Sequence, residues 1–377
     1  MAAIVHEAAL RRGLCHNPDT RIYLAPRDLL RGASAAPIVQ AGQALAVAGQ
    51  ALSFETVEVL LRDPERILSA RSDARNLRIW APQDGQSSAV ANQLARISAP
   101  RSPIAGLTMD GERPMIMGIL NVTPDSFSDG GDHVAPEDAI IRGKALIAAG
   151  ANLLDIGGES TRPGAEGIAP DVEAGRVVPV IKALAETGIP ISIDSRNVGV
   201  MSAALDAGAQ IVNDVSALTH DPAAVKFIAQ RGVPVILMHM RGDPKSMQDA
   251  PVYDCAPLDV FDWLEARIAA CVAAGIEEKT ILVDPGIGFG KTTQHNVEIL
   301  ARLSLLHGLG RPIVLGASRK RFIANLTPGE PAAKRRVPGS TATAIKAAEA
   351  GVQIIRVHDV AETVQALAVW RAMTDAV

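Results

Sequence analysis

The feature that most constrains the fold is a repeat that runs from about residue 112 to the end of the chain. Short apolar segments rich in Ile, Val and Leu alternate with longer, alanine-rich stretches. Apolar segments of this kind are typical of strands that are buried on both faces of a parallel sheet. We expect eight strands, at PMIMGILN (114–121), NLLDIGG (152–158), PISIDS (190–195), IVNDVS (211–216), VPVILMHM (233–240), TILVDPG (280–286), PIVLGAS (312–318) and IIRVHD (354–359).

The stretches between these strands predict helices, for example LDVFDWLEARIAACVAAG (258–275). Three of them end on a shared signal, AAGANLLD, DAGAQIVND and EAGVQIIRV, in which a glycine stands between a helix and the next strand. Glycine suits the end of a helix because it adopts positive φ without a steric penalty. Eight βα units of this total length predict an α/β fold, the (β/α)8 TIM barrel. A doubly wound open sheet is the alternative.

Polar side chains stand at or just after the carboxyl end of every expected strand. A single residue of this kind is as often a helix cap or a turn former as a ligand. In a barrel, however, the carboxyl ends of all strands meet at one mouth, where active sites lie. The sequence therefore predicts one polar, mixed-charge pocket formed by Asn121, Asp155, Glu159, Asp194, Asn213, Asp214, His239, Asp284, Ser318, Lys320, Arg356 and His358.

The residues before the repeat follow another pattern. RIYLAPRDLL and SFETVEVLLRD predict a strand or two and a helix, within a small N-terminal extension of unknown fold at residues 1–75. Residues 76–110 contain many Ser, Gln, Ala and Pro and predict a linker. The barrel is then expected at residues 111–377. Nothing in the first 110 residues indicates a function.

Composition narrows the class of protein. The chain is 48% hydrophobic with a net charge of −4, which gives no general attraction to nucleic acid or to an anionic membrane. No apolar run reaches the roughly 18 residues of a spanning helix, and the N-terminus lacks the pattern of a secretory signal. The three cysteines show no CxxC spacing, as expected in a reducing compartment. We therefore expect a cytoplasmic enzyme.

Two long loops follow the first two strands, NVTPDSFSDGG (121–131) and GGESTRPGAE (157–166). Loops of this composition can be plain surface turns. Their glycines, small hydroxyl groups and Arg162 instead favour covers that become ordered around a substrate, since the guanidinium of Arg162 suits a phosphate or a carboxylate.

A third segment, DPGIGFGKTT (284–293), comes close to a phosphate-binding GxxxxGK[ST] loop. That motif requires glycine where Pro285 stands, and proline lacks a backbone donor. ATP or GTP hydrolysis is therefore not expected. His, Cys and Glu also do not cluster with the spacing of a zinc site.

Charge is divided within the predicted pocket. Asp194, Asn213 and Asp284 offer the oxygen acceptors that the N–H edge of a nitrogen heterocycle requires. GASRKR (316–321) and RVHD (356–359) bring cations, and in the latter Arg356 and His358 point to one side of their strand. This division predicts a substrate in which a nitrogen heterocycle is joined to a phosphate.

These motifs together resemble the dihydropteroate synthases. The resemblance covers residues 112–377 and rests on seven segments in order: MGILNVTPDSFSDGG, GGESTRPGAE, VNDVS, LMHMRGDPKSMQ, VDPGIGFGK, GASRK and IIRVHDV. It implies a TIM barrel that condenses 6-hydroxymethyl-7,8-dihydropterin pyrophosphate with p-aminobenzoate, by an SN1-like displacement, to give 7,8-dihydropteroate and pyrophosphate in folate biosynthesis. It also implies Mg²⁺, inhibition by sulfonamides and a homodimer.

The resemblance further implies a role for individual residues. Pterin would bind to Asp194, Asn213, Met238, Asp284, Lys320 and Arg356. p-Aminobenzoate would bind near Phe127, Thr161, Arg162, Pro163, Phe289 and Ser318. Pyrophosphate would bind to Asn121, Arg162, Arg356 and His358, with Asn121 also a ligand of Mg²⁺. Asp194, Lys320 and Arg162 would act in catalysis.

The chain departs from the family pattern after Asp194, where Ser195-Arg196-Asn197 replaces the usual Thr and Lys positions, and at Arg321, where a small residue is common. Two other functions are open. One is a pterin-binding barrel used for methyl transfer, and the other is a non-catalytic paralogue that only binds ligands or partners. Arg162, His358 and the TPDSFSDGG loop favour the synthase over the methyl-transfer barrel. The non-catalytic paralogue is disfavoured by the presence of Asn121, Asp194, Asp284, Lys320 and Arg356.

Overall fold

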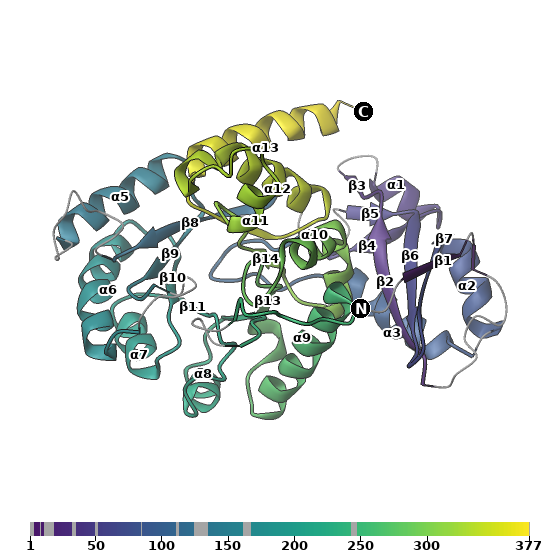
Figure 1. Ribbon diagram of the computed structural model, residues 1–377, viewed down its shortest axis with the longest axis horizontal. Coiled ribbons are helices and arrows are strands. Elements are labelled where there is room, and N and C mark those ends of the chain that lie inside the picture. Colours follow the sequence, from purple (N-terminus) through teal and green to yellow (C-terminus); the bar gives the residue numbers. More distant parts are fainter. Residues whose placement is uncertain are drawn as a thin grey trace.

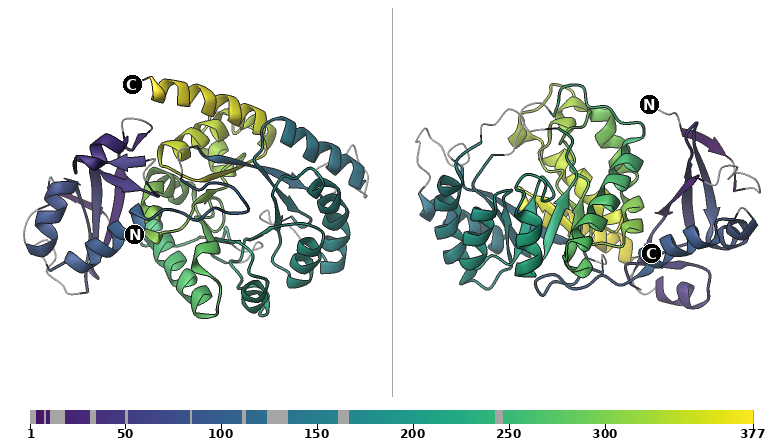
Figure 2. Two further views of the ribbon diagram at one scale, coloured as in Figure 1. Left: turned by 180° about the vertical axis from the view of Figure 1, so that it is seen from behind. Right: turned by 90° about the horizontal axis from the view of Figure 1, so that it is seen from below.

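A computed structural model describes the chain except for residues 1–3, 8, 11–18, 32–34, 50–51, 84, 111–112, 124–134, 161–166, 243–246 and 377. A large barrel lies beside a smaller N-terminal unit (Figure 1). The views from behind and from below show the same side-by-side arrangement (Figure 2). Among the described residues, no helix is both long enough and apolar enough to span a membrane.

Eight strands form the barrel, and each lies within a predicted segment. All neighbours are parallel, in the order β13-β12-β11-β10-β9-β8-β15-β14, and a parallel bridge between Val283 and Ile313 closes the cylinder. The TIM barrel is thus confirmed, and the doubly wound alternative is wrong. The strands are β8 (Met115–Asn121), β9 (Leu153–Gly157), β10 (Ile191–Asp194), β11 (Ile211–Asp214), β12 (Val235–Met238), β13 (Ile281–Asp284), β14 (Val314–Leu315) and β15 (Ile354–Val357).

Helices surround this cylinder (Figure 1). The predicted stop signals are confirmed, since Gly150, Gly208 and Gly351 have φ of +102°, +116° and +75° between a helix and a strand. The helices are α5 (Pro136–Ala148), α6 (Pro170–Ala185), α7 (Val198–Asp206), α8 (Ala224–Arg231), α9 (Ala256–Ala273), α10 (Thr293–Ala301), α11 (Arg321–Asn325), α12 (Val337–Glu349) and α13 (Val360–Asp375), with short 3-10 turns at η2 (Glu278–Thr280), η3 (Leu303–Leu309) and η4 (Ala333–Arg335).

Side chains alternate between the barrel interior and the helix layer, as strand geometry requires. One apolar cluster joins a residue from each of seven strands and therefore fills the interior: Met117, Leu153, Ile211, Ile236, Leu282, Val314 and Ile354. The intervening strand residues, such as Leu154, Val212 and Val283, pack in the cluster formed with the helices. The next inward position along each strand lies at the mouth.

The lower end of the barrel is filled by a segment that the sequence assigned to the linker. Ile104 and Met109 are 1% exposed and belong to the interior cluster. Two backbone hydrogen bonds between Ile104 and Leu107 fold this segment into a tight turn. Ile104 and Met109 are therefore part of the barrel's core, and Ala105 and Leu107 pack against it.

The rest of the predicted linker is mostly helical, so the prediction for residues 76–110 is wrong. Helix α2 (Ala74–Gln83) and helix α3 (Ser87–Ser98) bury Leu77, Trp80 and Ile97 against the N-terminal sheet. Ser, Gln and Ala lie mainly on the exposed faces of these helices, and this composition resembles that of a linker.

The N-terminal unit is a small α/β body with its own apolar core. Its larger sheet has the order β1-β7-β6-β2, in which β1 is parallel to β7 and the other pairs are antiparallel. A three-stranded antiparallel sheet, β3-β5-β4, lies beside helix α1 (Ala35–Gln40). The strands are β1 (Ile4–Glu7), β2 (Arg21–Arg27), β3 (Leu30–Arg31), β4 (Leu45–Val47), β5 (Leu52–Phe54), β6 (Thr56–Arg62) and β7 (Ile67–Asp73).

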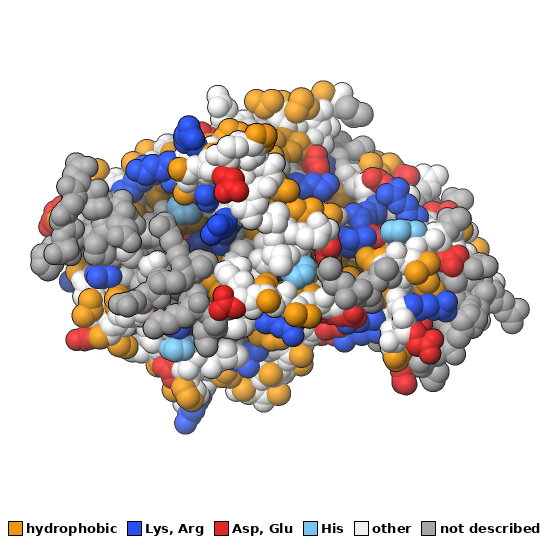
Figure 3. All heavy atoms as spheres, viewed as in Figure 1, with side chains coloured by type: hydrophobic (Ala, Val, Ile, Leu, Met, Phe, Trp, Pro, Cys, Tyr) orange, Lys and Arg blue, Asp and Glu red, His pale blue; other side chains and the backbone are white. Residues whose placement is uncertain are grey.

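Basic and acidic side chains are interspersed over the face shown in Figure 3, on the barrel and on the N-terminal unit alike. A mixed surface agrees with the small net charge of −4. This face therefore offers no continuous positive surface to a polyanion.

Candidate active site

The polar pocket begins at the inward positions that end the strands. Asp194 pairs with Gly157 on one side and with Asn213 on the other, and Met238 pairs with Asp284. Residues paired in this way on parallel strands have side chains on the same face. The predicted pterin residues of β10 to β13 thus lie on one rim of the barrel.

Arg356, on β15, binds side chains of β9 and β10. Its Nε donates to Asp155 Oδ2 at 2.5 Å, and its terminal nitrogen donates to Asp194 Oδ2 at 2.7 Å. Asn213 Nδ2 donates to the same Asp155 oxygen at 3.1 Å. Asp155 is fully buried, so its charge is compensated only inside the protein. One carboxylate therefore orients both the guanidinium of Arg356 and the amide of Asn213.

Asp284 lies across the same space. Its Oδ1 accepts a hydrogen bond of 2.7 Å from the backbone N–H of Gly286, and the carboxylate is only 5% exposed. At Gly316 the position that a Cβ would take lies 3.5 Å from Asp284 Oδ2 and 3.7 Å from Arg356 Cδ. Gly316 thus lies between Asp284 and Arg356, within van der Waals distance of both side chains.

Lys320, in the segment that follows β14, contacts the aromatic ring of Phe289 at the rim. Its Nζ lies 3.9 Å from the centroid of the Phe289 ring, a distance at which a cation is attracted to the ring face. The backbone of Gly288 passes close to the Lys320 stem, since a Cβ there would lie 3.1 Å from Lys320 Cδ. The GIGFG loop (residues 286–290) and the segment that follows β14 therefore approach each other at the rim.

The charges at this rim shift one another's protonation. Burial raises the pKa of Asp194, with Arg356 opposing the rise and Asp155 adding to it. Burial also raises the pKa of Asp284, and it lowers the pKa of Lys320 to about 7. A ligand that donates N–H groups to the carboxylates and accepts from Lys320 would stabilise the ionised forms. Perturbed acids and bases in one hollow are typical of functional sites.

Two further predicted residues meet beside β14 and β15. Ser318 Oγ accepts a hydrogen bond of 3.2 Å from the backbone N–H of His358 and lies 3.1 Å from His358 Nδ1. Asn121 is half-buried at the end of β8, and Met238 is 5% exposed at the end of β12. The structure thus brings the described members of the predicted site to one end of the barrel.

Four predicted residues, Phe127, Thr161, Arg162 and Pro163, lie outside the described residues. The departure at Ser195-Arg196-Asn197 is described. Arg196 forms a two-point ion pair with Glu159, with nitrogen–oxygen distances of 3.0 and 3.1 Å. Glu159 lies in the described first part of the GGESTRPGAE loop (157–166), so this pair holds that part against the end of β10.

Two strand-end residues do not take part in the pocket. Asp214 points away from the interior, where it accepts hydrogen bonds from the backbone of Ser216 and Leu218 and so shapes the turn after β11. His239 packs edge-on against Trp263 with ring centroids 5.0 Å apart. The prediction that both line the pocket is wrong, because alternation along a strand places neighbouring residues on opposite faces.

Sequence reasoning also missed a buried lysine. Lys291 Nζ donates to the backbone oxygens of Gly286 at 2.9 Å, Phe289 at 3.0 Å and His239 at 3.3 Å, and it lies 2.9 Å from His239 Nδ1. The side chain is 2% exposed. Lys291 therefore holds the GIGFG loop from beneath. Sequence analysis considered this lysine only as part of a near match to a phosphate-binding loop, and no local signal predicts its burial.

No group of three or more His, Cys, Asp or Glu side chains that could hold a metal occurs among the described residues. Asn121 offers one amide oxygen at the mouth. Mg²⁺ commonly takes one or two protein oxygens and completes its octahedron with water and substrate phosphates. The residues present thus fit an Mg²⁺ ion that arrives with a diphosphate, and they do not form a protein-only cage.

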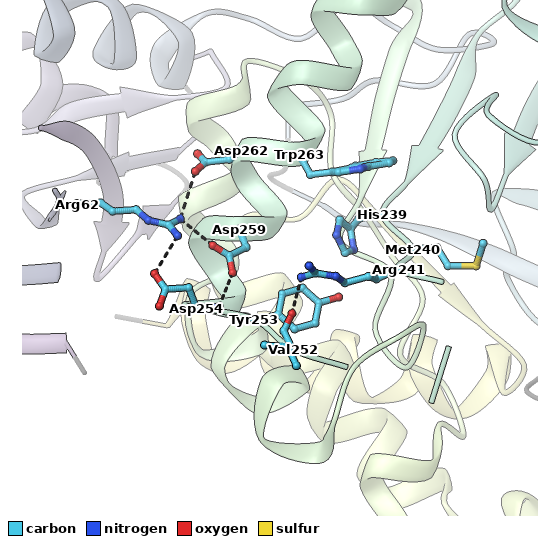
Figure 4. Close-up of a pocket in the computed structure, with 10 residues that line it drawn as sticks. All are labelled: Arg62, His239, Met240, Arg241, Val252, Tyr253, Asp254, Asp259, Asp262 and Trp263. Carbon is cyan, nitrogen blue, oxygen red and sulfur yellow. Dashed lines mark hydrogen bonds and ion pairs between the residues drawn. The ribbon is translucent and has the colours of Figure 1, made fainter. Parts of the chain in front are cut away.

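A hollow of about 650 Å³ lies beside the pocket, between the barrel and the N-terminal unit (Figure 4). Of the residues predicted to form the polar pocket, only His239 lines this hollow. The lining residues are Arg62, His239, Met240, Arg241, Val252, Tyr253, Asp254, Asp259, Asp262 and Trp263.

Comparison with known sequences identifies relatives of the barrel. The family model of pterin binding enzymes matches residues 117–358. Dihydropteroate synthase of Escherichia coli (strain K12) is 45% identical over 272 residues, which span 72% of this chain and 95% of that protein. The synthase of Mycobacterium leprae (strain TN) is 47% identical over 259 residues, or 67% of this chain and 91% of that protein.

Solved structures give the same result. Dihydropteroate synthase of Xanthomonas albilineans, solved with 4-aminobenzoic acid, is 50% identical, with a TM-score of 0.67 over 72% of this chain and 97% of that chain. The Yersinia pestis enzyme, solved as a sulfonamide complex, is 45% identical, with a TM-score of 0.68 over 73% of this chain and 99% of that chain. Nearly all of each relative thus corresponds to about three-quarters of this chain.

Proposed function

Since this chain belongs to the dihydropteroate synthase family of pterin-binding enzymes, we propose that it joins 6-hydroxymethyl-7,8-dihydropterin pyrophosphate to p-aminobenzoate. The products are 7,8-dihydropteroate and pyrophosphate, and the enzyme is a transferase of folate biosynthesis. The observation that carries this proposal is the group of charged side chains at the mouth, in which Arg356 binds Asp155 and Asp194 while the buried carboxylate of Asp284 lies across Gly316 from Arg356.

The pterin is held by its edge and by its faces. Asp284 Oδ2 accepts from the adjacent N–H groups of the pyrimidine edge, while Oδ1 stays fixed by Gly286. Asn213 accepts from the ring through its amide oxygen, because its amide nitrogen is held by Asp155. Lys320 donates to the ring carbonyl, and the planar guanidinium of Arg356 stacks on the ring beside Met238.

The leaving group needs positive charge. Breaking the C–O bond places negative charge on pyrophosphate and positive charge on the pterin methylene. Arg356 and His358, together with Arg162, bind the pyrophosphate, and Asp194 offsets the positive charge on the pterin. Mg²⁺, held by Asn121 and the diphosphate oxygens, would neutralise part of the leaving group's charge.

The second substrate attacks without a general base, because an aniline nitrogen is already a nucleophile. The p-aminobenzoate would bind between Phe289, Ser318 and the segments that carry Phe127, Thr161 and Pro163. Its nitrogen lone pair forms the new C–N bond and its proton leaves with solvent. Orientation of the two substrates supplies most of the rate.

The rival functions are less well supported. The relatives that cover the barrel are named dihydropteroate synthases, and the solved structure from X. albilineans with 7,8-dihydropteroate is 47% identical, with a TM-score of 0.64 over 71% of this chain and 95% of that chain. Asp284, Asn213 and Arg356 are all in place, which argues against a paralogue that has lost its site. A homodimer and a cytoplasmic location stay predictions.

The purified protein tests this proposal directly. Supplied with the pterin pyrophosphate, p-aminobenzoate and Mg²⁺, it should release pyrophosphate and form 7,8-dihydropteroate in equal amounts. Asp284→Ala should lower pterin affinity by about 100-fold, because a buried N–H pair loses a charged acceptor. Calorimetry that finds unchanged pterin affinity in this variant would refute the role of Asp284.

Inhibition gives a second test of the p-aminobenzoate site. The Yersinia pestis relative was solved with a sulfonamide. We expect sulfonamides to inhibit this enzyme in competition with p-aminobenzoate. Inhibition that added p-aminobenzoate does not relieve would contradict the assignment of that site.

A further inference from the structure

The N-terminal unit reaches the barrel through Arg62, the last residue of β6. Its guanidinium pairs with Asp254 at 3.0 Å, with Asp259 at 2.7 Å and with Asp262 at 3.3 Å (Figure 4). The Arg62 side chain is 23% exposed and that of Asp259 is 18% exposed, so this contact is partly withdrawn from water. A partly buried guanidinium group that binds several carboxylates contributes more to stability than an isolated ion pair on the surface does.

Asp259 binds both Arg62 and a segment that we call the strap. The strap comprises residues 247–255 and leads into α9. While Asp259 Oδ1 binds Arg62, its Oδ2 accepts from the backbone N–H of Asp254 at 2.8 Å and of Cys255 at 3.2 Å. The end of the strap is therefore fixed to Arg62 both through the backbone and through the Asp254 side chain.

The strap in turn binds the GIGFG loop of the proposed active site. Tyr253, which is 1% exposed, donates its hydroxyl to Gly290 O at 2.8 Å, and Gln248 Nε2 donates to Gly288 O at 2.7 Å. These two carbonyls flank Phe289, whose ring meets Lys320 Nζ. Ion pairs, hydrogen bonds, short stretches of backbone and one cation–π contact thus connect the N-terminal unit to the proposed p-aminobenzoate and pterin residues.

The hollow of about 650 Å³ lies along one side of the strap. Val252, Tyr253 and Asp254 of the strap form part of its wall, and Trp263 of α9 lies on the wall as well (Figure 4). Within the strap, Tyr253 and Cys255 are buried in the core, whereas Val252 is 71% exposed, so the polar contacts add to the packing that positions the strap.

We propose that Arg62 is a positioning residue for the synthase reaction: it fixes the strap, and the strap fixes the loop that holds Phe289 beside Lys320. This inference rests on the proposed function. Arg62 lies outside residues 117–358, the part matched by the pterin binding family, so the N-terminal unit supplies a support that this family match does not include.

Arg62→Gln tests the inference in the full-length enzyme. We expect KM for p-aminobenzoate to rise by about fivefold or more, while kcat changes by less than about twofold. The reason is that Phe289 is no longer held in its position in the binding site, whereas the reacting groups are unchanged. Pterin affinity should change less than the KM for p-aminobenzoate, because Asp284 and Asn213 do not contact the strap and only Lys320 among the pterin residues meets Phe289. Arg62→Lys should recover part of the loss, since an ammonium can keep one of the three partners.

Arg21→Gln is the matched control. Arg21 pairs with Asp262 and Glu265 on α9, so its loss also weakens the contact between the two units, but it touches no strap residue. This variant should keep the wild-type KM. A rise in KM equal to that of Arg62→Gln would show that general docking, and not the strap, is responsible, and it would overturn the inference.

Other outcomes are equally decisive. A wild-type KM in Arg62→Gln, with the wild-type enzyme active, refutes the inference and leaves the proposed function intact. A wild-type protein without synthase activity instead refutes the proposed function. If Arg62→Gln does not fold, Asp254→Asn removes one partner of Arg62 from the strap, and a KM for p-aminobenzoate unchanged in that variant contradicts the inference as well.

Discussion

At the scale of single residues, Asp155 shows how one buried carboxylate organises a site that it does not enter. It binds Arg356 and Asn213, which come from strands on either side of β9 and β10. Its second oxygen has no hydrogen-bond partner among the described residues. Such an oxygen is a strong acceptor, and it adds negative charge to the interior that keeps Arg356 ionised.

Asp155→Ala should therefore reduce both stability and pterin affinity. Removing one partner of a buried ion pair lowers the free energy of unfolding by about 3 kcal/mol or more. Pterin affinity should fall because Arg356 and Asn213 lose their orientation. Urea denaturation and calorimetry measure the two effects.

Asp214→Ala is the control for Asp155→Ala. Asp214 is equally buried but binds only the turn after β11, so its loss should lower stability and leave pterin affinity nearly unchanged. Equal losses of pterin affinity in both variants would contradict a specific role for Asp155.

Lys320 makes stability depend on pH. Burial lowers its pKa in the folded protein to about 7, whereas an unfolded chain keeps a pKa near 10.5. Between these values the unfolded state binds more protons, so this group makes the free energy of unfolding rise with pH, by up to about 1.4 kcal/mol per unit. Below pH 7 both states are protonated and the dependence ends.

Lys320→Met should remove that rise. Denaturation midpoints measured between pH 7 and pH 10 should increase more steeply in the wild type than in the variant, while Lys182→Met, at an exposed position on α6, should behave as the wild type does. Parallel curves for wild type and Lys320→Met would show that the Lys320 ammonium is not destabilised by burial.

At the scale of elements, the GIGFG loop shows what the glycines of a near match to a phosphate-binding motif do in this fold. Gly286 has φ of +65°, and a Cβ there would lie 1.9 Å from the carbonyl oxygen of His239. No other residue fits this approach. The glycines therefore serve close backbone packing over Lys291, and not a phosphate.

Lys291→Met tests the structural role of that lysine. Three backbone carbonyls would lose their donor in a nearly dry site, and we expect the free energy of unfolding to fall by about 2–3 kcal/mol. The KM for p-aminobenzoate should rise, since Phe289 lies in the loop. Denaturation and steady-state kinetics measure these changes.

Lys346→Met is a control for Lys291→Met, because Lys346 is exposed on α12 and pairs only with Glu349. It should change stability by less than about 0.5 kcal/mol. A similar small effect of Lys291→Met would mean that the loop is held by other contacts.

At the scale of the whole molecule, the segment that the sequence assigned to a linker (76–110) is divided between the two units. Ile104 and Met109 fill the lower end of the barrel, whereas α2 and α3 belong to the N-terminal core. We propose that the boundary between the two units lies near residue 99, after α3, and not at residue 111.

Two truncations test this boundary. A chain that begins at residue 99 keeps the segment that closes the barrel, and a chain that begins at residue 111 loses it. Because Ile104 and Met109 are each 1% exposed, the shorter chain should be less stable by about 3–6 kcal/mol, the value of burying two large apolar side chains. Equal denaturation midpoints would place the boundary at the predicted position.

Local pattern determined much of this protein. Strand positions, the glycine stops and the ring of polar residues at the strand ends all followed from the sequence, because alternation and helix termination depend on residues only a few positions apart. The inward position of Asp194, Asn213 and Asp284 follows from the same regularity. Failures at Asp214 and His239 came from treating neighbours along one strand as sharing a face.

The tertiary structure alone decided which distant residues meet. Asp155 and Arg356 are 201 residues apart in sequence. Arg62 and Asp259, whose ion pair joins the two units, are 197 residues apart. The role of Lys291 and the burial of Ile104 are of the same kind. Contacts between far segments depend on how every intervening element packs, so no local periodicity encodes them.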